Sequence, residues 1–302
     1  MQGKSRRIFW ILLAAAFVLV SFLLCQLPVD GASYAEQILT RCGLGARAGE
    51  DVHKLVFLDV GQGDCALLMS DGQVALIDTG TGLDDGLSLV RELRQQGVTS
   101  IDYLLLSHPH NDHIGGAAAL LDSFPVRQIY CTFNTPKDSA DAFVFDHLQS
   151  AAAAVDVPFS DYPASSFAVG HFTVEPLYRD DFLPDENDRS QFLKVSGFDF
   201  TAIFTGDCGS AAETSLLHSG LSVSADLLKI GHHGSGSSTS EAFLAAVQPR
   251  FAVISVGENT YGHPADAVLD RLSAAGCEVF RTDVNGKITF DFSETCTIRS
   301  ER

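Results

Sequence analysis

The chain has 302 residues, of which 46% are hydrophobic and 19% are charged, so it is long and apolar enough to bury the core of a globular domain. Lys and Arg number 20 against 38 Asp and Glu, which gives a formal net charge of −18. This balance excludes a broad basic surface that would bind nucleic acid by neutralising phosphates. It leaves room for a polyanionic substrate at one site, because bound cations can supply positive charge locally.

The N-terminus has the pattern of an export signal. Lys4, Arg6 and Arg7 precede an apolar run from Ile8 to Leu24, whose length is close to the minimum of about 17 residues for a membrane-spanning helix. Basic residues before such a run predict a cytoplasmic N-terminus and an exported remainder. An uncleaved signal anchor and a signal peptide cut after Ala35 are both compatible with it. We therefore expect the protein to be membrane-anchored with an extracytoplasmic domain, or secreted.

From His53 onward, short apolar runs alternate with turn residues, which predicts strands first and then strands alternating with helices. Such an order indicates mixed sheets covered by helices. The stretch from 133 to 185 gives no clear pattern. Strands are expected at 55–60, 66–69, 74–78, 103–107, 192–196, 198–205, 225–230, 251–256, 278–282 and 287–292, and helices at about 83–96, 114–121, 239–247 and 265–275. The expected parts of the chain are a signal segment (1–30), a linker (31–52) and one folded domain (53–302).

The strongest chemical signal is the run His108-Pro109-His110-Asn111-Asp112-His113, which directly follows a hydrophobic strand. In extended backbone alternate side chains share a face, so His108 and His110 can converge on one ion. Asp112 and His113 begin the next turn and can serve a second ion. Imidazole and carboxylate suit zinc, iron or manganese. A polar loop of merely solvated histidines is the alternative, but three histidines and an aspartate within six residues make it improbable.

One turn cannot supply all the ligands of two ions. Asp207, in Thr205-Gly206-Asp207, follows another buried strand and is placed to bridge two cations. Two further turns with histidines follow apolar strands: Gly231-His232-His233-Gly234-Ser235 and Tyr261-Gly262-His263-Pro264. The four remaining histidines are interpreted as incidental surface or capping residues; they are His53, His147, His171 and His218.

These features together resemble the metallo-β-lactamase-fold hydrolases, whose hallmark is His-x-His-x-Asp-His at a strand end. More narrowly, the chain is similar to the C-terminal hydrolase domain of ComEC/Rec2-type competence (DNA-uptake) proteins over most of residues 53–292. The resemblance implies an α/β (α+β) fold, a four-layer αββα sandwich, with two divalent metal ions, zinc or manganese, and hydrolysis by a metal-bound hydroxide. The motifs that carry it are Leu58-Asp59-Val60-Gly61-Gln62-Gly63-Asp64, Asp78-Thr79-Gly80, His232-His233-Gly234-Ser235, and Val256-Gly257-Glu258-Asn259 leading to Tyr261-Gly262-His263-Pro264.

The resemblance also assigns roles to individual residues. His108 and His110 would bind the first metal, Asp112 and His113 the second, and Asp207 would bridge them. His263 stands in the place of the last metal histidine. The remaining candidates are His233 with His232, as a ligand or proton donor beside the site, Asp78 as a support for the ligands, and Asp64 as a residue that faces the site.

The chain departs from the wider family at one ligand position. About twenty residues before the bridging aspartate, where another histidine is usual, it has Glu186-Asn187-Asp188-Arg189-Ser190. The ComEC-like branch is similar in having Asn there. The first metal would then be held by Asn187 or Asp188, be bound loosely, or be replaced by a harder ion such as manganese.

The function implied is hydrolysis of a phosphodiester in DNA or a nucleotide outside the membrane, with Asp112 or Asp207 orienting the hydroxide and His233 or His263 protonating the leaving oxygen. One alternative keeps the site and changes the substrate to a lactone, thioester or β-lactam. A second alternative is a non-catalytic binding module that kept the fold. The expected partners are a DNA or nucleotide substrate and the membrane, through the N-terminal segment.

Overall fold

A computed structural model describes residues 28–29, 32–33 and 52–302. The expected signal segment and linker lie almost entirely outside these residues, so their assignment stays a prediction. In the part of the chain that is described, no helix combines the length and hydrophobicity needed to cross a membrane. The chain divides into two compact units, Met1–Arg47 with Arg91–Thr99 and Ala48–Val90 with Ser100–Arg302.

The first unit contains a pair of short antiparallel strands, β1 (Pro28–Val29) and β2 (Ala32–Ser33). It also contains the second half of helix α3 (Leu87–Gln95) and the turn that follows. Gly97 lies in that turn with a φ of +82°, a conformation typical of a glycine that ends a helix.

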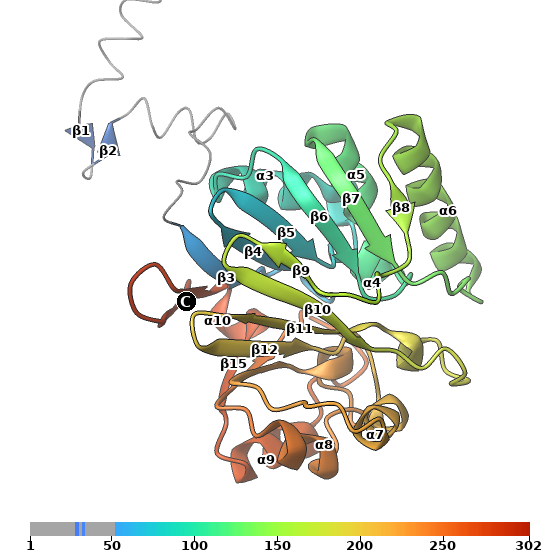
Figure 1. The fold of residues 1–302 in the computed structure, drawn as a ribbon, viewed down its shortest axis with the longest axis vertical. Helices are drawn as coiled ribbons and strands as arrows, with labels where there is room; N and C mark the ends of the chain where they lie inside the picture. The colour runs from blue at the N-terminus through green and yellow to red at the C-terminus, as the bar shows by residue number, and fades with distance from the viewer. Residues whose placement is uncertain (1–27, 30–31, 34–51) are drawn as a thin grey trace, which may run out of the picture. The chain divides into compact units, whose positions relative to one another are not determined.

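The second unit is built on an eight-stranded and a seven-stranded sheet (Figure 1). The eight-stranded sheet has the order β17-β16-β3-β4-β5-β6-β7-β8, in which β5 to β8 are parallel and the other pairs antiparallel. Its strands are β3 (His53–Phe57), β4 (Ala66–Ser70), β5 (Gln73–Ile77), β6 (Ile101–Leu106), β7 (Val126–Cys131), β8 (Phe159–Ser160), β16 (Ile288–Asp291) and β17 (Thr297–Ser300).

The seven-stranded sheet repeats this plan. Its order is β15-β14-β13-β12-β11-β10-β9, with β12 to β15 parallel and β9 to β12 antiparallel. Its strands are β9 (Phe167–Val169), β10 (Phe172–Tyr178), β11 (Phe192–Gly197), β12 (Phe200–Phe204), β13 (Leu227–Lys229), β14 (Phe251–Ile254) and β15 (Glu278–Arg281).

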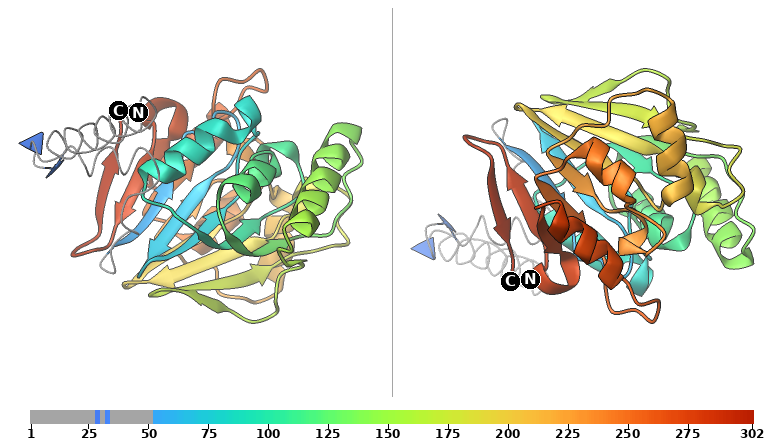
Figure 2. Two further views of the ribbon diagram at one scale, coloured as in Figure 1. Left: turned by 90° about the horizontal axis from the view of Figure 1, so that it is seen from above. Right: turned by 90° about the horizontal axis from the view of Figure 1, so that it is seen from below.

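Helices lie on the outer faces of the two sheets. Figures 1 and 2 show α5 and α6 on one side of the sheet pair and α7, α8 and α9 on the other. The α-helices of this unit are α4 (Asn111–Ile114), α5 (Ala117–Ser123), α6 (Ser139–Ala154), α7 (Ser210–His218), α8 (Glu241–Val247), α9 (Asp266–Ala274) and α10 (Thr282–Asn285), and the short 3-10 segments are η1 (Leu83–Gly86), η2 (Asn187–Arg189) and η3 (Gly231–Gly234).

Apolar clusters of the described residues hold these layers together. One lies between the sheets, where Phe57 stacks on Phe204 with ring centroids 5.8 Å apart and Phe290 meets both sheets. Another joins the seven-stranded sheet to its helices and includes Leu216 and Phe243. The expected mixed α/β fold with two sheets covered by helices is thereby confirmed.

The structure differs from the expected elements in several places, and it adds β7, α7 and β17, which were not expected. A helix predicted over 114–121 is split: α4 begins at Asn111, within the histidine-rich run, and the chain turns at Gly115 and Gly116 before α5. Helix α6 occupies much of the stretch that gave no pattern. It starts at Asp138, whose carboxylate accepts hydrogen bonds from the backbone N–H groups of Ala140 and Asp141.

Candidate metal centre

The candidate site lies where parallel strands of both sheets end. Asp78 follows β5, the histidine-rich run follows β6, Asp207 follows β12, and His232 and His233 follow β13. The carboxyl ends of parallel strands in one sheet meet at one edge. Packing two such sheets face to face therefore brings together residues that are far apart in the sequence.

Four of these residues form one cluster: Asp112, His113, Asp207 and His233 each offer a ligand atom, and the four atoms lie within 4.8 Å of one another. Asp207 stands between the two imidazoles. Its Oδ1 is 3.1 Å from Nε2 of His113 and its Oδ2 is 3.6 Å from Nε2 of His233. Oδ2 of Asp112 lies 3.2 Å from Nε2 of His233. The structure thus places the carboxylate of Asp207 between His113 and His233.

In both clustered imidazoles, Nδ1 forms a hydrogen bond on the side of the ring away from the cluster. Nδ1 of His113 donates to Oδ2 of Asp78 over 2.8 Å, and Asp78 also accepts from the backbone N–H and the hydroxyl of Ser107. Nδ1 of His233 donates to the backbone carbonyl of Ser255 over 2.9 Å. Such partners fix the tautomer, so that Nε2 of both rings is left for a cation.

His108 and His110 lie beside this cluster, with ring centroids 4.5 Å apart, and the ring of His108 is 4.2 Å from that of His113. Nδ1 of His108 contacts the hydroxyl of Ser107 at 3.1 Å. Nε2 of His110 is 3.2 Å from a carboxylate oxygen of Glu186, which leaves Nδ1 of His110 as the nitrogen available to a cation.

The electrostatics of the cluster favour positive charge at its centre. Burial opposes an imidazolium at His233, but Asp207, Asp112 and Asp64 outweigh it and raise the pKa of His233 to about 10. For His113, too, burial is outweighed by the carboxylates of Asp207 and Asp78, and its pKa rises well above the usual value. Although burial disfavours its charge, His113 and His233 hold the pKa of Asp207 well below its usual range. The carboxylates are thus arranged to stabilise cations.

Several buried polar atoms of the described residues have no hydrogen-bond partner: Nε2 of His108, Nε2 of His113 and Oδ1 of Asp207. Burying such atoms without a partner costs free energy. These are nitrogen and carboxylate donors on one surface, the set that zinc and related ions prefer. The residues therefore fit a metal centre.

Close backbone packing fixes the histidine-rich turn. A Cβ on Gly115 would lie 2.4 Å from the backbone of Thr81, and a Cβ on Gly63 would lie 2.6 Å from the carbonyl oxygen of Asp112. On the other side of the cluster, His232 and His233 both have positive φ, +49° and +52°. Two consecutive non-glycine residues in the left-handed region are strained, and such strain is concentrated at functional sites.

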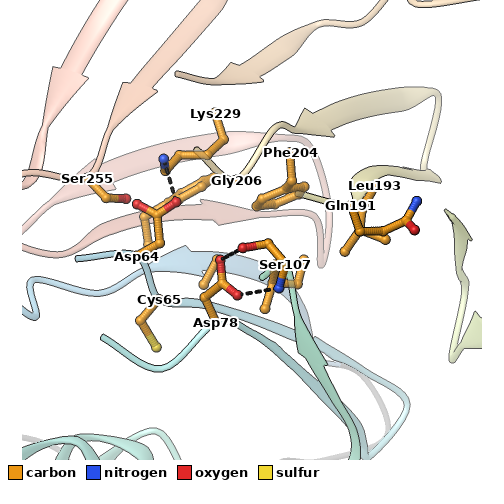
Figure 3. Close-up of a pocket in the computed structure, with 13 residues that line it drawn as sticks. Asp64, Cys65, Asp78, Ser107, Gln191, Leu193, Phe204, Gly206, Lys229 and Ser255 are labelled. Atoms are coloured by element: carbon orange, nitrogen blue, oxygen red, sulfur yellow. Dashed lines mark hydrogen bonds and ion pairs between the residues drawn. The ribbon is translucent and has the colours of Figure 1, made fainter. Parts of the chain in front are cut away.

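A buried ion pair lies next to His233. Figure 3 shows this pair, in which Nζ of Lys229 lies 2.6 Å from Oδ2 of Asp64. Oδ1 of Asp64 is 3.3 Å from Nδ1 of His233. Lys229 and Asp64 are 2% and 4% exposed, so the pair is removed from water. Asp64 thus lies next to His233, on the side of the ring that faces away from Asp207.

An open pocket of about 590 Å³ gives access to the cluster. His263 and His232 line it, with ring centroids 5.5 Å apart, and the carboxylate of Asp207 is 3.8 Å from Nε2 of His232. The structure places His233 in the four-residue cluster and His263 in the pocket wall.

Asn187 lines the same pocket, and its buried side-chain oxygen has no hydrogen-bond partner. Asp188 points to another place: its carboxylate accepts a hydrogen bond of 2.7 Å from the backbone N–H of Gly209, just before α7. Of the two residues expected in place of the usual histidine, Asn187 is therefore the one whose side-chain oxygen is available as a metal ligand at the pocket.

Comparison with known proteins gives the family. The chain matches the model of the Metallo-beta-lactamase superfamily over residues 58–258. The chain belongs to this superfamily. It is a hydrolase of that group with a His/Asp cluster able to bind metal ions.

Three curated relatives are also similar. "ComE operon protein 3" of Bacillus subtilis (strain 168) is 28% identical over 78% of this chain and 32% of its own length. "Competence protein ComA" of Neisseria gonorrhoeae is 33% identical over 77% of this chain and 31% of its own length. "Recombination protein 2" of Haemophilus influenzae is 30% identical over 78% of this chain and 28% of its own length. The chain thus spans about a third of the length of these relatives, and the predicted resemblance to competence proteins is confirmed.

Among solved structures, the metallo-beta-lactamase fold protein YhfI from Bacillus subtilis superposes with a TM-score of 0.54. It is 14% identical, and the match covers 79% of this chain and 99% of YhfI. At this identity the likeness shows the fold alone, which agrees with the two-sheet architecture.

Apart from Asp78 and Asp64, the residues behind the ligands were not predicted from the sequence. Lys229 could have been found, because it is a lysine within the apolar strand Leu227–Lys229, where a charge needs a buried partner. Glu186, Ser107 and Ser255 carry no such local signal.

We expect Glu186→Ala to weaken metal binding about 10- to 100-fold, because His110 loses the carboxylate that orients its ring. Glu186→Gln, which keeps an accepting oxygen, should retain most of the affinity. Titration of each apoprotein with Zn²⁺ by calorimetry measures this. Equal affinities for the alanine variant and the parent protein would contradict the assigned role.

Proposed function

We propose that the protein is an exported, metal-dependent phosphodiesterase that acts on DNA or nucleotides. The observation that carries the proposal is a buried His/Asp cluster at the base of an open pocket of about 590 Å³, a size typical of small-molecule sites. Two of the relatives are named for competence and for recombination, and both processes involve DNA. The substrate is inferred from the likeness of this chain to about a third of each relative.

Two cations, zinc or manganese, would be held by neighbouring sets of residues. His108 and His110, with the amide oxygen of Asn187, suit the first, while Asp112 and His113 suit the second. Asp207, whose carboxylate lies close to His113 and His233, would be shared by the two ions. When bound, such ions supply charge to a phosphoryl group and lower the pKa of water.

The residues of the pocket define the other roles. Asp112, whose side chain is about one-third exposed at the cluster, can accept a proton and orient an attacking water. His263 is placed in the pocket wall to protonate a leaving oxygen. Its burial, with the neighbouring imidazoles of His232 and His233, lowers its pKa, which makes the protonated ring a stronger acid.

Positive charge for a phosphate must come from the cations. Among the described residues that line the pocket there is no lysine or arginine, whereas Asp141 and Glu258 add negative charge. We therefore expect binding of a phosphodiester to be strictly metal-dependent.

The test is cleavage of end-labelled single-stranded DNA and of bis-p-nitrophenyl phosphate by the full chain, with Mn²⁺, with Zn²⁺ and with EDTA. The comparison is with a double variant, His110→Ala with Asp207→Ala, and with the matched surface variant His147→Ala on α6. Cleavage is expected from the parent protein and the surface variant only. Equal cleavage by the double variant would overturn the proposal.

A base-stacking residue is suggested at the pocket rim. Tyr261 is 74% exposed, lines the pocket and lies 5.8 Å from the ring of His263. Base stacking on an aromatic ring contributes about 1–3 kcal/mol. We expect Tyr261→Ala to raise KM for single-stranded DNA about tenfold, with kcat on bis-p-nitrophenyl phosphate unchanged and Tyr261→Phe close to the parent protein. An equal effect on both substrates would contradict stacking.

A second candidate function is hydrolysis of a lactone, thioester or β-lactam. The acidic lining of the pocket, with Asp141 and Glu258, favours such less charged substrates. A panel of nitrocefin, an acyl-homoserine lactone and a glutathione thioester, run beside the DNA assay, separates the cases. Metal binding with no turnover of any of these would leave a binding module as the function.

The extracytoplasmic location and membrane tether are proposed from the basic and apolar N-terminal segment, residues 4–24. Fractionation of cells that produce the full chain, with protease added to intact cells or spheroplasts, tests this. Protection from the protease in spheroplasts would contradict it.

A further inference from the structure

A second group of potential metal ligands lies at the other end of the strands. His53 begins β3, Asp71 lies in the turn between β4 and β5, and His171 lies in the turn between β9 and β10. Asp64 and the metal centre lie beyond the opposite end of β3, a strand about 13 Å long. The group joins the eight-stranded sheet to a turn of the seven-stranded sheet.

The three side chains converge on one point. Nε2 of His171 is 3.1 Å from Oδ2 of Asp71, and Nε2 of His53 is 3.8 Å from Oδ1 of Asp71. One ligand atom from each lies within 4.8 Å of the others. Bonds of about 2.0–2.1 Å in tetrahedral geometry place ligand atoms about 3.3 Å apart. Small side-chain rotations therefore suffice to bring two imidazole nitrogens and a carboxylate oxygen onto one ion.

The backbone around the group is fixed before any ion binds. The hydroxyl of Ser70 lies 2.8 Å from Nδ1 of His53 and accepts a hydrogen bond of 2.9 Å from the backbone N–H of His171. The neighbouring N–H of Gly170 donates to the side chain of Gln73 over 2.6 Å. Gly170 has a φ of +56°, and a Cβ there would lie 2.4 Å from Ser70. The two turns that carry Asp71 and His171 are thus held together.

The hydrogen bonds of the group also suit a metal ligand. With Nδ1 of His53 held by Ser70, Nε2 is left to face the carboxylate. The ring of Phe198 lies beside both imidazoles, with its centroid 4.8 Å from that of His53 and 5.7 Å from that of His171. Within residues 52–302, the ion pairs of the Asp71 carboxylate are both with these imidazoles.

We propose that His53, Asp71 and His171 form a second metal site, separate from the catalytic centre, that binds Zn²⁺ or a similar transition-metal ion. Two imidazoles and one carboxylate are a donor set for zinc, with a fourth position open to water because His171 is exposed. Its role is structural: the ion links the start of β3 to the β9–β10 turn and so stabilises the folded domain by mass action.

The experiment uses the full chain stripped of metal. In a variant that lacks two catalytic ligands, His110→Ala with Asp207→Ala, titration with Zn²⁺ is expected to show about one remaining site, and Co²⁺ should give the visible absorption of a tetrahedral complex. Adding His171→Ala should remove that site and the rise in Tm caused by Zn²⁺. The matched control adds His218→Ala, an exposed histidine on α7, and should leave both unchanged.

A second variant guards against a folding defect in the multiple variants. Asp71 has a φ of +51°, a conformation that asparagine tolerates. Asp71→Asn alone, in the otherwise unaltered chain, should lower bound zinc by about one ion and leave hydrolytic activity unchanged. The proposal would be overturned if His171→Ala and Asp71→Asn bound as much zinc as the proteins they were made from and showed the same rise in Tm with zinc. Because the readout is metal content and Tm, that result leaves the proposed phosphodiesterase function untouched.

Discussion

Replacing Asp207 by alanine is expected to abolish hydrolysis. Its buried carboxylate lies 3.1 Å from His113 and 3.6 Å from His233, so the substitution removes a negative charge that two imidazoles of the cluster share. Metal ions supply several kcal/mol of transition-state stabilisation, and the loss of a shared ligand should therefore lower kcat by about 10³-fold or more.

The measurement is kcat on bis-p-nitrophenyl phosphate together with metal content. Asp207→Asn keeps the shape of the side chain but not the charge, and it should also lose most of the bound metal. Asp270→Ala, an exposed aspartate on α9, is the matched control and should behave like the parent protein. Circular dichroism of each variant checks the fold. An Asp207→Ala protein with more than about a tenth of the parent kcat would show that this carboxylate does not organise the site.

Local sequence patterns were enough to predict many of the strands and the turn that carries His108 to His113. Apolar runs between turn residues mark β3, β4 and β5, and a hydrophobic strand that leads into three histidines and an aspartate is typical of a metal-binding turn. Asp207 was also predicted as a site residue, from its place after a strand. These features depend on residues close together in the chain, which is why a single sequence reveals them.

The pairing of distant residues could not be predicted in this way. Glu186 contacts His110 across 76 positions, and His53 meets His171 only because two sheets pack face to face. His53 and His171 were therefore predicted to be incidental surface residues. Nothing near either residue in the sequence distinguishes it from a solvated histidine.

The prediction of helix boundaries was also limited by contacts between residues far apart in the sequence. Helix α4 begins at Asn111, earlier than apolar spacing suggests, and the backbone N–H of Asn111 donates to the carboxylate of Asp141 on α6. A contact across 30 positions thus satisfies the first turn of the helix. Since α6 itself showed no clear pattern, this partner was not visible in the sequence.

Replacing Lys229 by methionine is expected to lower the free energy of unfolding more than the other single substitutions considered above. The lysine and Asp64 are both buried and their charged atoms are 2.6 Å apart. Removing one partner of a buried ion pair leaves the other charge uncompensated, which costs about 3–5 kcal/mol. For a domain of this size, Tm should fall by about 10 °C. Equilibrium unfolding in urea measures the change in the free energy of unfolding.

A double-mutant cycle separates the ion pair from simple packing. Lys229→Met together with Asp64→Leu replaces both charges by apolar groups and should recover much of the lost stability, since such replacements are often close to neutral. Asp64→Leu alone should be destabilising, because the ammonium group is then unpaired. If the loss in free energy of unfolding of the double variant equals the sum of the losses of the two single variants, the pair contributes no coupling energy. In that case Lys229 acts through packing alone.

The pH dependence gives a further check on the same pair. Burial alone would raise the pKa of Asp64, but Lys229 and His233 outweigh it and lower that pKa below the ordinary value. The wild-type carboxylate therefore contributes stability above the unfolded pKa, which is lost only as the pH falls through the folded pKa. Without Lys229, the pKa of Asp64 in the folded protein shifts upward because its buried charge has lost its partner. When that pKa lies above the value in the unfolded chain, the free energy of unfolding falls as the pH rises from the unfolded to the folded pKa. The deficit of Lys229→Met relative to the parent protein should thus be larger at about pH 8 than at about pH 5. A deficit that is constant over this range would indicate that no buried carboxylate titrates and that the lysine is held for its shape.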